Sequence, residues 1–294
     1  MKHYANKITL NYFNGWRTKL VLPCLSIGRY IHINNQYISR KGRINMNQVI
    51  ETILDHRSVR SFQDRKLSRE QVETIVRSAQ SASTSSFIQA YTIIGVTDQE
   101  KKDKLAEVVG NQPYVANNGH FFVFCADLNR IAVSAAMENK DVTPALQSTE
   151  KFMVSLIDAA LAAQNAAIAA ESMDLGICYI GGIRNQLEDV QQILKTPEYV
   201  IPLFGLAVGY PAKINDQKPR LPLEHVYMEN EYQQDEDVFK RQLEDYNQII
   251  STYYKERTAG KREDTWTGQM VDMLGQKARM YMKDFVQKQK MDLR

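Results

Sequence analysis

The sequence predicts an α+β protein. Four short runs rich in β-branched and aromatic residues lie along the chain, and stretches with apolar residues at helical spacing lie between them. Hydrophobic residues make up 44% of the 294, which is enough to bury the core of one large domain or two small ones. The sequence shows no internal repeat with a period of roughly 20 to 50 residues.

Each strand candidate is short and rich in Val, Ile, Phe or Tyr, which favour an extended backbone. The candidates are YTIIGV at 91–96, HFFVFCAD at 120–127, GICYIGG at 176–182 and IPLFGLAVG at 201–209. Helices are expected between them.

Two helices are expected near the start of the patterned region. Apolar residues recur at helical spacing over residues 47–55, which predicts a short amphipathic helix. The next helix begins at Ser68, whose hydroxyl can cap it, and Gln71 completes a capping box. This helix is expected to stop in the hydroxyl-rich segment 81–86, because such side chains bond the local backbone instead of propagating a helix.

The longest predicted helix runs from about Lys151 to Asp174 and carries Ala, Leu, Ile and Met on nearly every face. Polar residues such as Asp158 and Glu171 interrupt it. We therefore expect a helix buried in a core or a subunit interface, and not one that spans a bilayer. Gly176 is the residue expected to end this helix in the left-handed conformation.

Charge is unevenly distributed along the chain. The formal net charge is +3, yet residues 1–45 hold eight Lys or Arg and neither Asp nor Glu. The rest of the chain carries 29 basic against 34 acidic residues, a net charge of −5. Because no interleaving of aromatic and basic residues follows this leader, the composition does not favour a nucleic-acid-binding protein.

Residues 1–45 have the features of neither a signal peptide nor a transit peptide. The apolar run LVLPCLSIG is short and broken by Pro23, and the segment is rich in Asn, Ile, Tyr and Lys, as A/T-rich DNA read without selection would be. Residues 41–43 can be encoded by a purine-rich ribosome-binding sequence. We therefore expect Met46 to be the natural first residue, residues 1–45 to be a non-native, disordered extension, and residues 46–294 to be the functional domain.

Cysteine and histidine usage favours neither disulfides nor a metal centre. Cys24, Cys125 and Cys178 show no paired spacing, and two of them lie in apolar runs, so we expect buried thiols in a reducing cytoplasm. The five histidines show no HExxH or similar ligand spacing, and no metal is expected.

The segment HRSVRSF at 56–62 concentrates imidazole, guanidinium and hydroxyl groups between two predicted helices. By itself it could be a solvated basic turn. The same groups suit a phosphate dianion, because a guanidinium binds two of its oxygens at once. Two further segments favour phosphate and ring binding: KPRLP at 218–222 presents two cations on a stiff loop, and YIGG at 179–182 allows close approach of a flat ring.

The motifs HRSVRSF, ASTSSFIQAY, GNQPYV, ICYIGGIRN, IPLFGLAVGYPA, KPRLP and KREDTW together resemble the FMN-dependent nitroreductase superfamily. The resemblance is closest to its NADPH-dependent flavin and nitro reductase branch, and it runs from about Met46 to the C-terminus in family order. It implies a nitroreductase fold, in which helices flank a central mixed or antiparallel sheet. It also implies a C-terminal helical excursion and an intertwined homodimer.

The resemblance implies that several segments bind FMN. His56, Arg57 and Ser58 match the surroundings of the FMN phosphate and ribityl chain, while Lys218 and Arg220 would close on the phosphate from the other side. The other matching residues are Arg60, near flavin N1 and O2; Thr84, Ser85, Ser86 and Gln112, which are expected from the partner subunit; and Tyr179, Ile180, Gly181 and Gly182, whose backbone faces flavin N5 and O4. The cation near N1 would stabilise the negative charge that develops when flavin accepts a hydride.

The resemblance also implies an electron donor. Arg257 and Arg262 match arginines at the adenosine 2'-phosphate, with Lys261 adjacent, which favours NADPH over NADH; the alternative is a solvated charged segment. Arg279 matches a mobile arginine near the acceptor site. The predicted catalytic group is thus Arg60, Gly181 and Arg279.

The sequence therefore predicts a cytoplasmic, homodimeric, NADPH-dependent FMN oxidoreductase that reduces flavins, nitroaromatics or quinones by ping-pong hydride transfer. Neither a membrane nor a nucleic acid is an expected partner. The alternative is a flavin-binding redox sensor or store without significant turnover, although the cationic cluster at 257–262 favours turnover. The sequence leaves open the physiological acceptor and the strictness of the NADPH preference.

Overall fold

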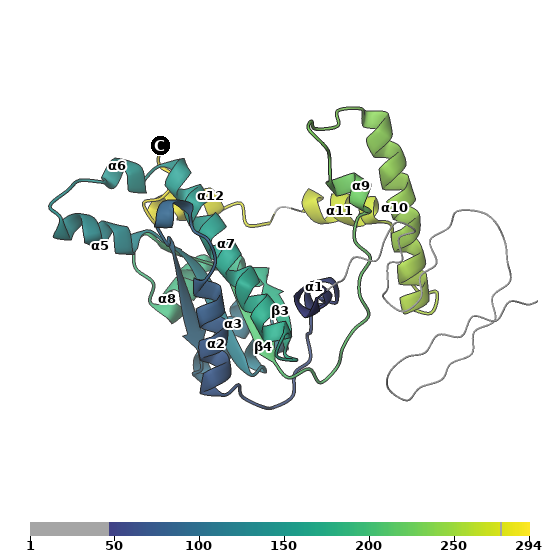
Figure 1. Cartoon of the computed structure of the whole chain (residues 1–294), viewed down its shortest axis with the longest axis horizontal. Coiled ribbons are helices and arrows are strands. Elements are labelled where there is room, and N and C mark those ends of the chain that lie inside the picture. Colours follow the sequence, from purple (N-terminus) through teal and green to yellow (C-terminus); the bar gives the residue numbers. More distant parts are fainter. Residues whose placement is uncertain (1–46, 277) are drawn as a thin grey trace, which may run out of the picture. The chain divides into compact units, whose positions relative to one another are not determined.

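The computed structural model describes residues 47–276 and 278–294 (Figure 1). The prediction that residues 1–45 are a disordered upstream extension lies outside these residues, as does Cys24. Both remaining thiols, Cys125 and Cys178, are buried and free, as the sequence predicts.

The described residues contain one four-stranded sheet in the order β1-β2-β4-β3. Its strands are β1 Tyr91–Val96, β2 His120–Asp127, β3 Gly176–Ile180 and β4 Val200–Gly209. Neighbouring strands of this sheet pair antiparallel, which confirms the predicted α+β fold. The central strands β2 and β4 are buried along nearly their whole length, which explains why their sequences read as continuous apolar runs.

The helices of the described residues are α1 Gln48–Leu54, α2 Arg69–Gln80, α3 Gln99–Val108, α4 Pro113–Ala116, α5 Asn129–Met137, α6 Thr143–Leu146, α7 Thr149–Glu171, α8 Leu187–Leu194, α9 Leu223–Val226, α10 Glu236–Arg257, α11 Trp266–Gly275 and α12 Met282–Lys288, with the short 3-10 helices η1 Ser85–Phe87 and η2 Gly181–Asn185. Three of them, α1, α2 and α7, correspond to the three segments for which the sequence predicts helix bounds. The predicted capping box at Ser68 and Gln71 is present in both directions.

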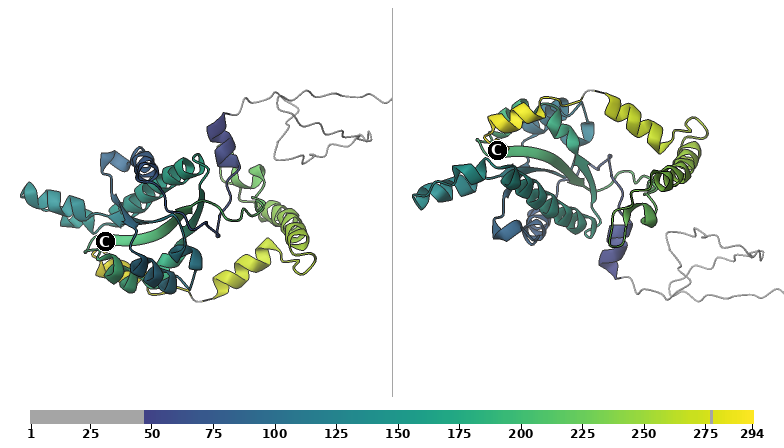
Figure 2. Two further views of the ribbon diagram at one scale, coloured as in Figure 1. Left: turned by 90° about the horizontal axis from the view of Figure 1, so that it is seen from below. Right: turned by 90° about the horizontal axis from the view of Figure 1, so that it is seen from above.

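Helices cover both faces of the sheet (Figure 2). Helices α2 and α7 lie on one face, and α3, α8 and α12 lie on the other. Helix α7 contacts all four strands through a row of buried alanines, because small side chains let a helix approach a sheet closely. Among the described helices, α7 alone is long and apolar enough to cross a membrane, but nearly half of its most apolar stretch is buried inside the protein.

The end of α7 differs from the prediction. Asp174, with φ 59°, takes the left-handed conformation that the sequence assigned to Gly176. Gly176 instead opens β3, where an added Cβ would lie 2.7 Å from a methyl group of Val59. The glycine is needed there for close backbone packing and not for helix termination. The predicted strand 176–182 also ends earlier, at Ile180, because η2 begins at Gly181.

A second, small core forms after β4. Tyr246, Ile250 and Tyr254 on α10 are buried, and Leu221, Tyr253 and Trp266 pack against them. Helices α10 and α11 contact each other directly. This core sets the positions of the segments that carry Lys218 and Arg262.

His120, at the start of β2, is a half-buried base for which the described residues show no ion pair. Its Nε2 atom is buried and has no hydrogen-bond partner among the described residues. Gly95 makes room for the ring, since a Cβ there would lie 2.8 Å from Nε2. Burial, and secondly the charge of Lys102, lower the pKa of His120 to about 4.

His120 should therefore destabilise the fold in acid. Between pH 6.5 and about 4 the unfolded chain binds a proton at His120 that the folded chain does not, so the free energy of unfolding falls as the pH falls through this window. His120→Phe keeps a ring and removes the titration. Urea unfolding at pH 7 and pH 4.5 should show that the variant loses roughly 1 to 2 kcal/mol less than the wild type, a value discounted for partial exposure. An equal loss in both proteins would contradict this assignment.

Candidate functional site

The segment 56–62 is an extended element that pairs with other backbone at Ser58 and at Phe62, and is not a solvated turn between helices. Ser58 forms a parallel bridge with Ile177 of β3, and the Val59 N–H donates to the Ile177 carbonyl at 2.8 Å. Phe62 forms an antiparallel bridge with Pro211, just beyond β4. These non-local backbone contacts fix the cationic side chains beside the ends of two strands.

The first residues of the segment have carboxylate partners. His56 Nδ1 lies 2.7 Å from Glu171 Oε1, at the last turn of α7, and both side chains are mostly buried. The Arg57 guanidinium contacts the Asp55 carboxylate, and its Nε donates to the Asp55 carbonyl at 3.1 Å. Both side chains are thereby oriented before any ligand binds.

Arg60 lies in a group with Tyr114 and Gln112. Its charge acts on the Tyr114 hydroxyl, where burial raises the pKa and Arg60 opposes the rise. That hydroxyl donates to Gln112 Oε1 at 2.6 Å. The same cation acts on the Cys178 thiol of β3, whose pKa is raised by burial. Arg60 is thus the exposed, positively charged member of a group whose other side chains, Gln112, Tyr114 and Cys178, are partly or fully buried.

Gln112 belongs to this group within its own chain. Its Nε2 donates to the Val109 carbonyl at 2.9 Å and would lie 3.2 Å from a Cβ on Gly182. The resemblance grouped Gln112 with residues 84–86 as a contribution from the partner subunit. In the described residues Gln112 lies next to the glycine pair that follows β3 in its own chain, and its contribution to the partner subunit's site stays a prediction.

Two guanidinium groups lie at η2, the short helix that follows β3. Arg279, with φ 58°, donates through Nε and Nη2 to Asn185 Oδ1 at 3.1 and 2.8 Å. Arg184 donates to the Leu203 carbonyl at 2.6 Å, and burial followed by the charge of Arg279 lowers its pKa. Arg279 is therefore held against Asn185 at the end of η2, whereas Arg184 lies beside Gly181, with Nη2 3.3 Å from a Cβ placed there.

The KPRLP segment reaches both the 56–62 region and α10. Gln217 donates to the Leu54 carbonyl at 2.9 Å, directly before the HRSVRSF motif. Lys218 Nζ lies 5.4 Å from the centre of the Tyr254 ring, and Arg220 is close enough to Tyr246 to lower its pKa against the effect of burial. The predicted phosphate cations thus both lie beside tyrosines of the small core on α10.

The candidate NADPH residues lie at the end of α10. Arg257 donates to the Tyr253 hydroxyl at 2.8 Å. Arg262 lies 4.4 Å from the centre of the Tyr254 ring, and its Nε is 2.7 Å from Asp264 Oδ2. Lys261 is exposed. Lys218 and Arg262 therefore share one aromatic ring, although the sequence assigned them to different phosphates.

The hydroxyl-rich residues Thr84, Ser85 and Ser86 lie apart from these groups, on the loop between α2 and β1. The Ser85 N–H donates to the buried carboxylate of Asp158 on α7 at 3.0 Å.

Tyr179, also a predicted site residue, is exposed by 37% and packs edge-on against Phe204 with ring centres 5.7 Å apart.

Sequence reasoning missed the residues that orient the site. Tyr114, Glu171 and Asn185 each hold a predicted site residue in place. Two signals were available, since GNQPYV contains Tyr114 and ICYIGGIRN contains Asn185. Glu171 carried no signal, because its contact with His56 spans 115 residues of chain.

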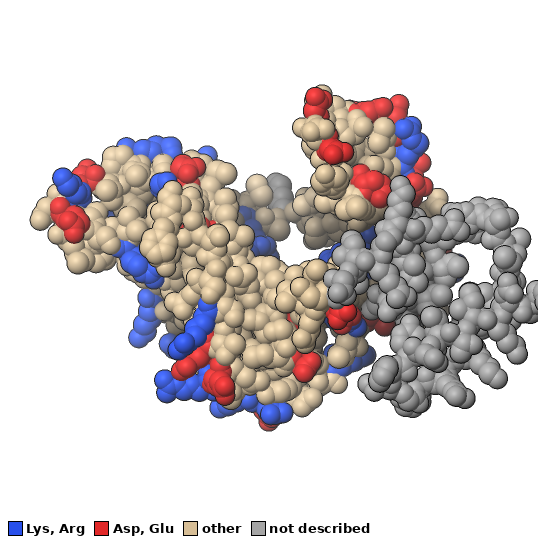
Figure 3. Space-filling model, viewed as in Figure 1, with Lys and Arg blue, Asp and Glu red and all other residues tan. Residues whose placement is uncertain are grey.

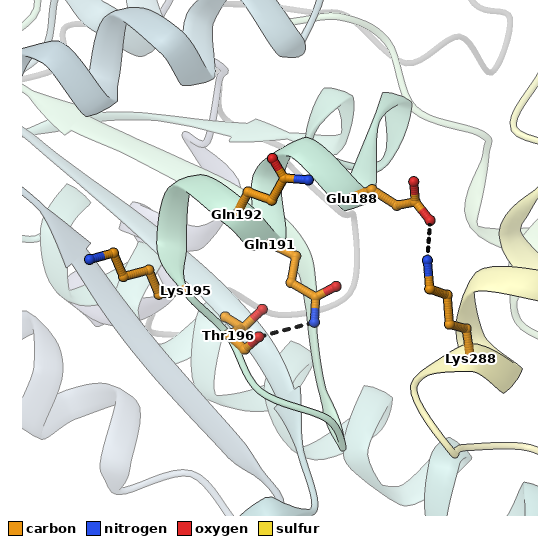
Figure 4. A pocket seen from close by; sticks show the side chains of 6 residues that line it. All are labelled: Glu188, Gln191, Gln192, Lys195, Thr196 and Lys288. Carbon is orange, nitrogen blue, oxygen red and sulfur yellow. Dashed lines mark hydrogen bonds and ion pairs between the residues drawn. The ribbon is translucent and has the colours of Figure 1, made fainter.

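Two surface depressions of the described residues lie elsewhere. One, of about 420 Å³, lies between α8 and α12 (Figure 4) and is lined by Glu188, Gln191, Gln192, Lys195, Thr196 and Lys288. The other, of about 430 Å³, lies between α2 and β1 and includes Ile88, Tyr91 and Arg130. Neither contains Arg60, Gly181 or another of the predicted site residues. The donor set, and not a cavity, identifies the candidate site within one chain.

A methyl group at Gly182 should displace η2. A Cβ there would lie 2.6 Å from the Val109 carbonyl oxygen, which belongs to the backbone and cannot rotate away. Gly182→Ala should lower the free energy of unfolding by about 1 to 3 kcal/mol in urea titrations. Gly275→Ala is the matched control, because no atom lies within 4 Å of its Cβ position, and its effect should stay near zero. Equal effects of the two variants would refute the packing argument.

Comparisons with known proteins identify the family of the chain. The model of the nitroreductase family matches residues 53–210, and that of the nitroreductase family C-terminal domain matches residues 218–294. The chain is 58% identical over 241 residues to the FMN reductase (NADPH) of Bacillus subtilis (strain 168), which covers 82% of this chain and 97% of that protein. It is 46% identical over 242 residues to an NADPH-dependent oxidoreductase of Staphylococcus aureus (strain MSSA476), with 82% and 96% covered.

Among solved structures, that of B. megaterium NfrA1 superimposes with a TM-score of 0.83 and 63% sequence identity, covering 84% of this chain and 100% of that one. The antiparallel sheet and its flanking helices are thus those of a known fold. The resemblance found in the motifs is confirmed, and the chain belongs to the nitroreductase family.

Proposed function

We propose that this chain is an NADPH-dependent FMN oxidoreductase that reduces flavins, nitroaromatics or quinones. The observation that carries the proposal is the backbone pairing of the segment 56–62 with Ile177 of β3, which fixes the His56–Arg60 donors beside the strand that Gly181 follows. The names of the relatives support the same activity.

The residues present fit FMN by their chemistry. Guanidinium, imidazole and hydroxyl donors stand on an extended backbone that is already fixed, which suits a phosphate monoester and a ribityl chain. Gly181, half-buried at the end of β3, has no side chain that would keep a flat ring away from the backbone. We assign the phosphate side to His56, Arg57 and Ser58.

The remaining assignments complete the proposed cofactor site. Lys218 and Arg220 are cations for the phosphate, and Thr84, Ser85 and Ser86 serve the partner subunit's site. The residues assigned to the ring are Arg60, Gln112, Tyr179, Ile180, Gly181 and Gly182. Bound FMN would supply two-electron hydride chemistry between NADPH and the acceptor.

The chain's own contribution to the reaction is electrostatic and positional. Arg60 is itself exposed and keeps a positive charge beside the partly buried Tyr114 hydroxyl. Arg279, held by Asn185 at the end of η2, adds a second cation at the proposed acceptor position. Neither role requires a nucleophilic side chain.

We assign NADPH recognition to Arg257, Lys261 and Arg262. Arg262 is held over the Tyr254 ring and paired with Asp264, so a 2'-phosphate would replace a weak, exposed ion pair by a stronger charge-assisted contact. Lys261 is exposed at the turn after α10 and can add to the positive field there.

We propose that the protein is a homodimer of the cytoplasm. Met153, Ile157 and Leu161 follow one another at helical spacing on α7 and are exposed by 51%, 52% and 45%. Figure 3 shows that the face over α7 is largely free of charged side chains. A second copy would cover this apolar face, and the predicted site would gain the residues at 84–86.

The activity has a direct test. The purified full chain should be yellow with bound FMN, NADPH should bleach the flavin at once, and added free flavin, nitroaromatic or quinone should restore the colour with continued NADPH consumption. A folded, colourless protein that takes up no FMN would overturn the proposal. Bound flavin that NADPH reduces without turnover of any acceptor would instead support a redox sensor or store.

Arg262 should decide the preference for NADPH. Removing one charge-assisted hydrogen bond costs about 1.5 kcal/mol at an exposed site, so Arg262→Ala should raise the KM for NADPH roughly tenfold. The KM for NADH should change less than twofold, because NADH lacks the 2'-phosphate. Arg241→Ala, at an exposed position on α10, is the control and should leave both constants unchanged. A parallel rise for both nucleotides would show that Arg262 does not read the phosphate.

A further inference from the structure

Asp158 is a buried carboxylate that the proposed reaction does not use. It lies in the middle of α7 and is fully buried. Its two oxygens accept backbone N–H groups at both ends of one loop: Oδ1 from Ser85 and Oδ2 from Ala90, each at 3.0 Å. Within residues 47–276 and 278–294, no ion pair to Asp158 is found.

The loop that Asp158 holds is strained. Ser86, Phe87 and Gln89 have φ values of 48°, 59° and 51°, although none of them is glycine. Left-handed backbone is unfavourable for such residues and persists only where the surroundings enforce it. Asp158 provides that enforcement from a rigid base, because α7 contacts all four strands.

Nothing in the described part of a single chain explains why this loop is strained. Phe87, at the tip of the loop, is exposed by 82%. In the described part of the chain, no hydrogen bond or ion pair joins residues 84–87 to Arg60 or Gly181. A loop that only had to connect α2 to β1 would need neither three left-handed residues nor a buried charge, which is costly to desolvate.

We propose that Asp158 is a positioning residue: it holds the loop 85–90 in its left-handed form, so that Thr84, Ser85, Ser86 and Phe87 enter the FMN site of the partner subunit. This inference rests on the proposed function. Ile157 and Leu161, exposed on the same turns of α7, place the loop's anchor within the face proposed for the dimer.

Asp158→Asn keeps the shape of the side chain and removes its charge and one of its two acceptors. The variant should bind FMN at least tenfold more weakly than the wild type in a fluorescence titration of apoprotein. Ile75→Ala, a cavity variant in the core, controls for lost stability and should change FMN affinity less than twofold. An unchanged FMN affinity in Asp158→Asn would overturn the inference, whereas a wild type that binds no FMN would overturn the proposed function itself.

Mixed dimers test whether the loop acts on the partner. An Asp158→Asn chain is combined with an Arg57→Ala chain through two different tags, at an FMN concentration that saturates only the wild-type site. If the loop acts across the interface, one site combines both intact halves and the mixed dimer holds one FMN. If the loop acts within its own chain, both sites are defective and the mixed dimer holds none, which overturns the inference.

Two further measurements keep the inference testable if Asp158→Asn does not fold. Hydrogen exchange in the wild type should show protected amides at Ser85 and Ala90. Exchange of both amides at the rate of an open loop would refute the claim that Asp158 holds the loop. Gln89→Gly, which relieves left-handed strain, should restore folding and part of the FMN affinity when added to Asp158→Asn. Restored folding without any gain in FMN affinity would mean that Asp158 serves stability alone.

Discussion

The candidate site depends on the backbone pairing of residues 58–62 with β3 and with the chain just beyond β4. Helical and loop segments can carry arginines anywhere on a surface, but hydrogen bonds to Ile177 and the bridge to Pro211 fix where these arginines stand. The pairing also explains Gly176, which must lack a side chain so that Val59 can pack against it. One non-local contact thus fixes the positions of the donor residues and explains why a glycine stands at position 176 of the neighbouring strand.

Polar contacts around this pairing orient the side chains in advance. Glu171 holds His56, Gln112 holds Tyr114, and Asn185 holds Arg279. Preorganised donors need little rearrangement when a ligand binds, so less binding energy is spent on ordering them. The same principle accounts for the strained loop between α2 and β1, where the buried carboxylate of Asp158 on α7 fixes backbone that would otherwise relax.

Much of the fold could be predicted from the sequence because its signals are local. The buried strands β2 and β4 read as apolar runs, and the capping box at Ser68 marks the start of α2. The left-handed residue after α7 was placed wrongly, at Gly176, because packing against Val59 outweighs the local preference of glycine. The orienting contact between His56 and Glu171 could not be predicted, since no short-range pattern records a pair so distant in the chain.

The ring of Tyr254 has a consequence for redesign of nucleotide choice. Lys218 and Arg262 both lie over this ring. We assign Lys218 to FMN and Arg262 to NADPH. Substitutions at this tyrosine would disturb retention of the flavin and selection of the reductant at the same time. Variants with a new coenzyme preference are therefore better sought at Arg257, which lies over Tyr253 instead, or at Lys261.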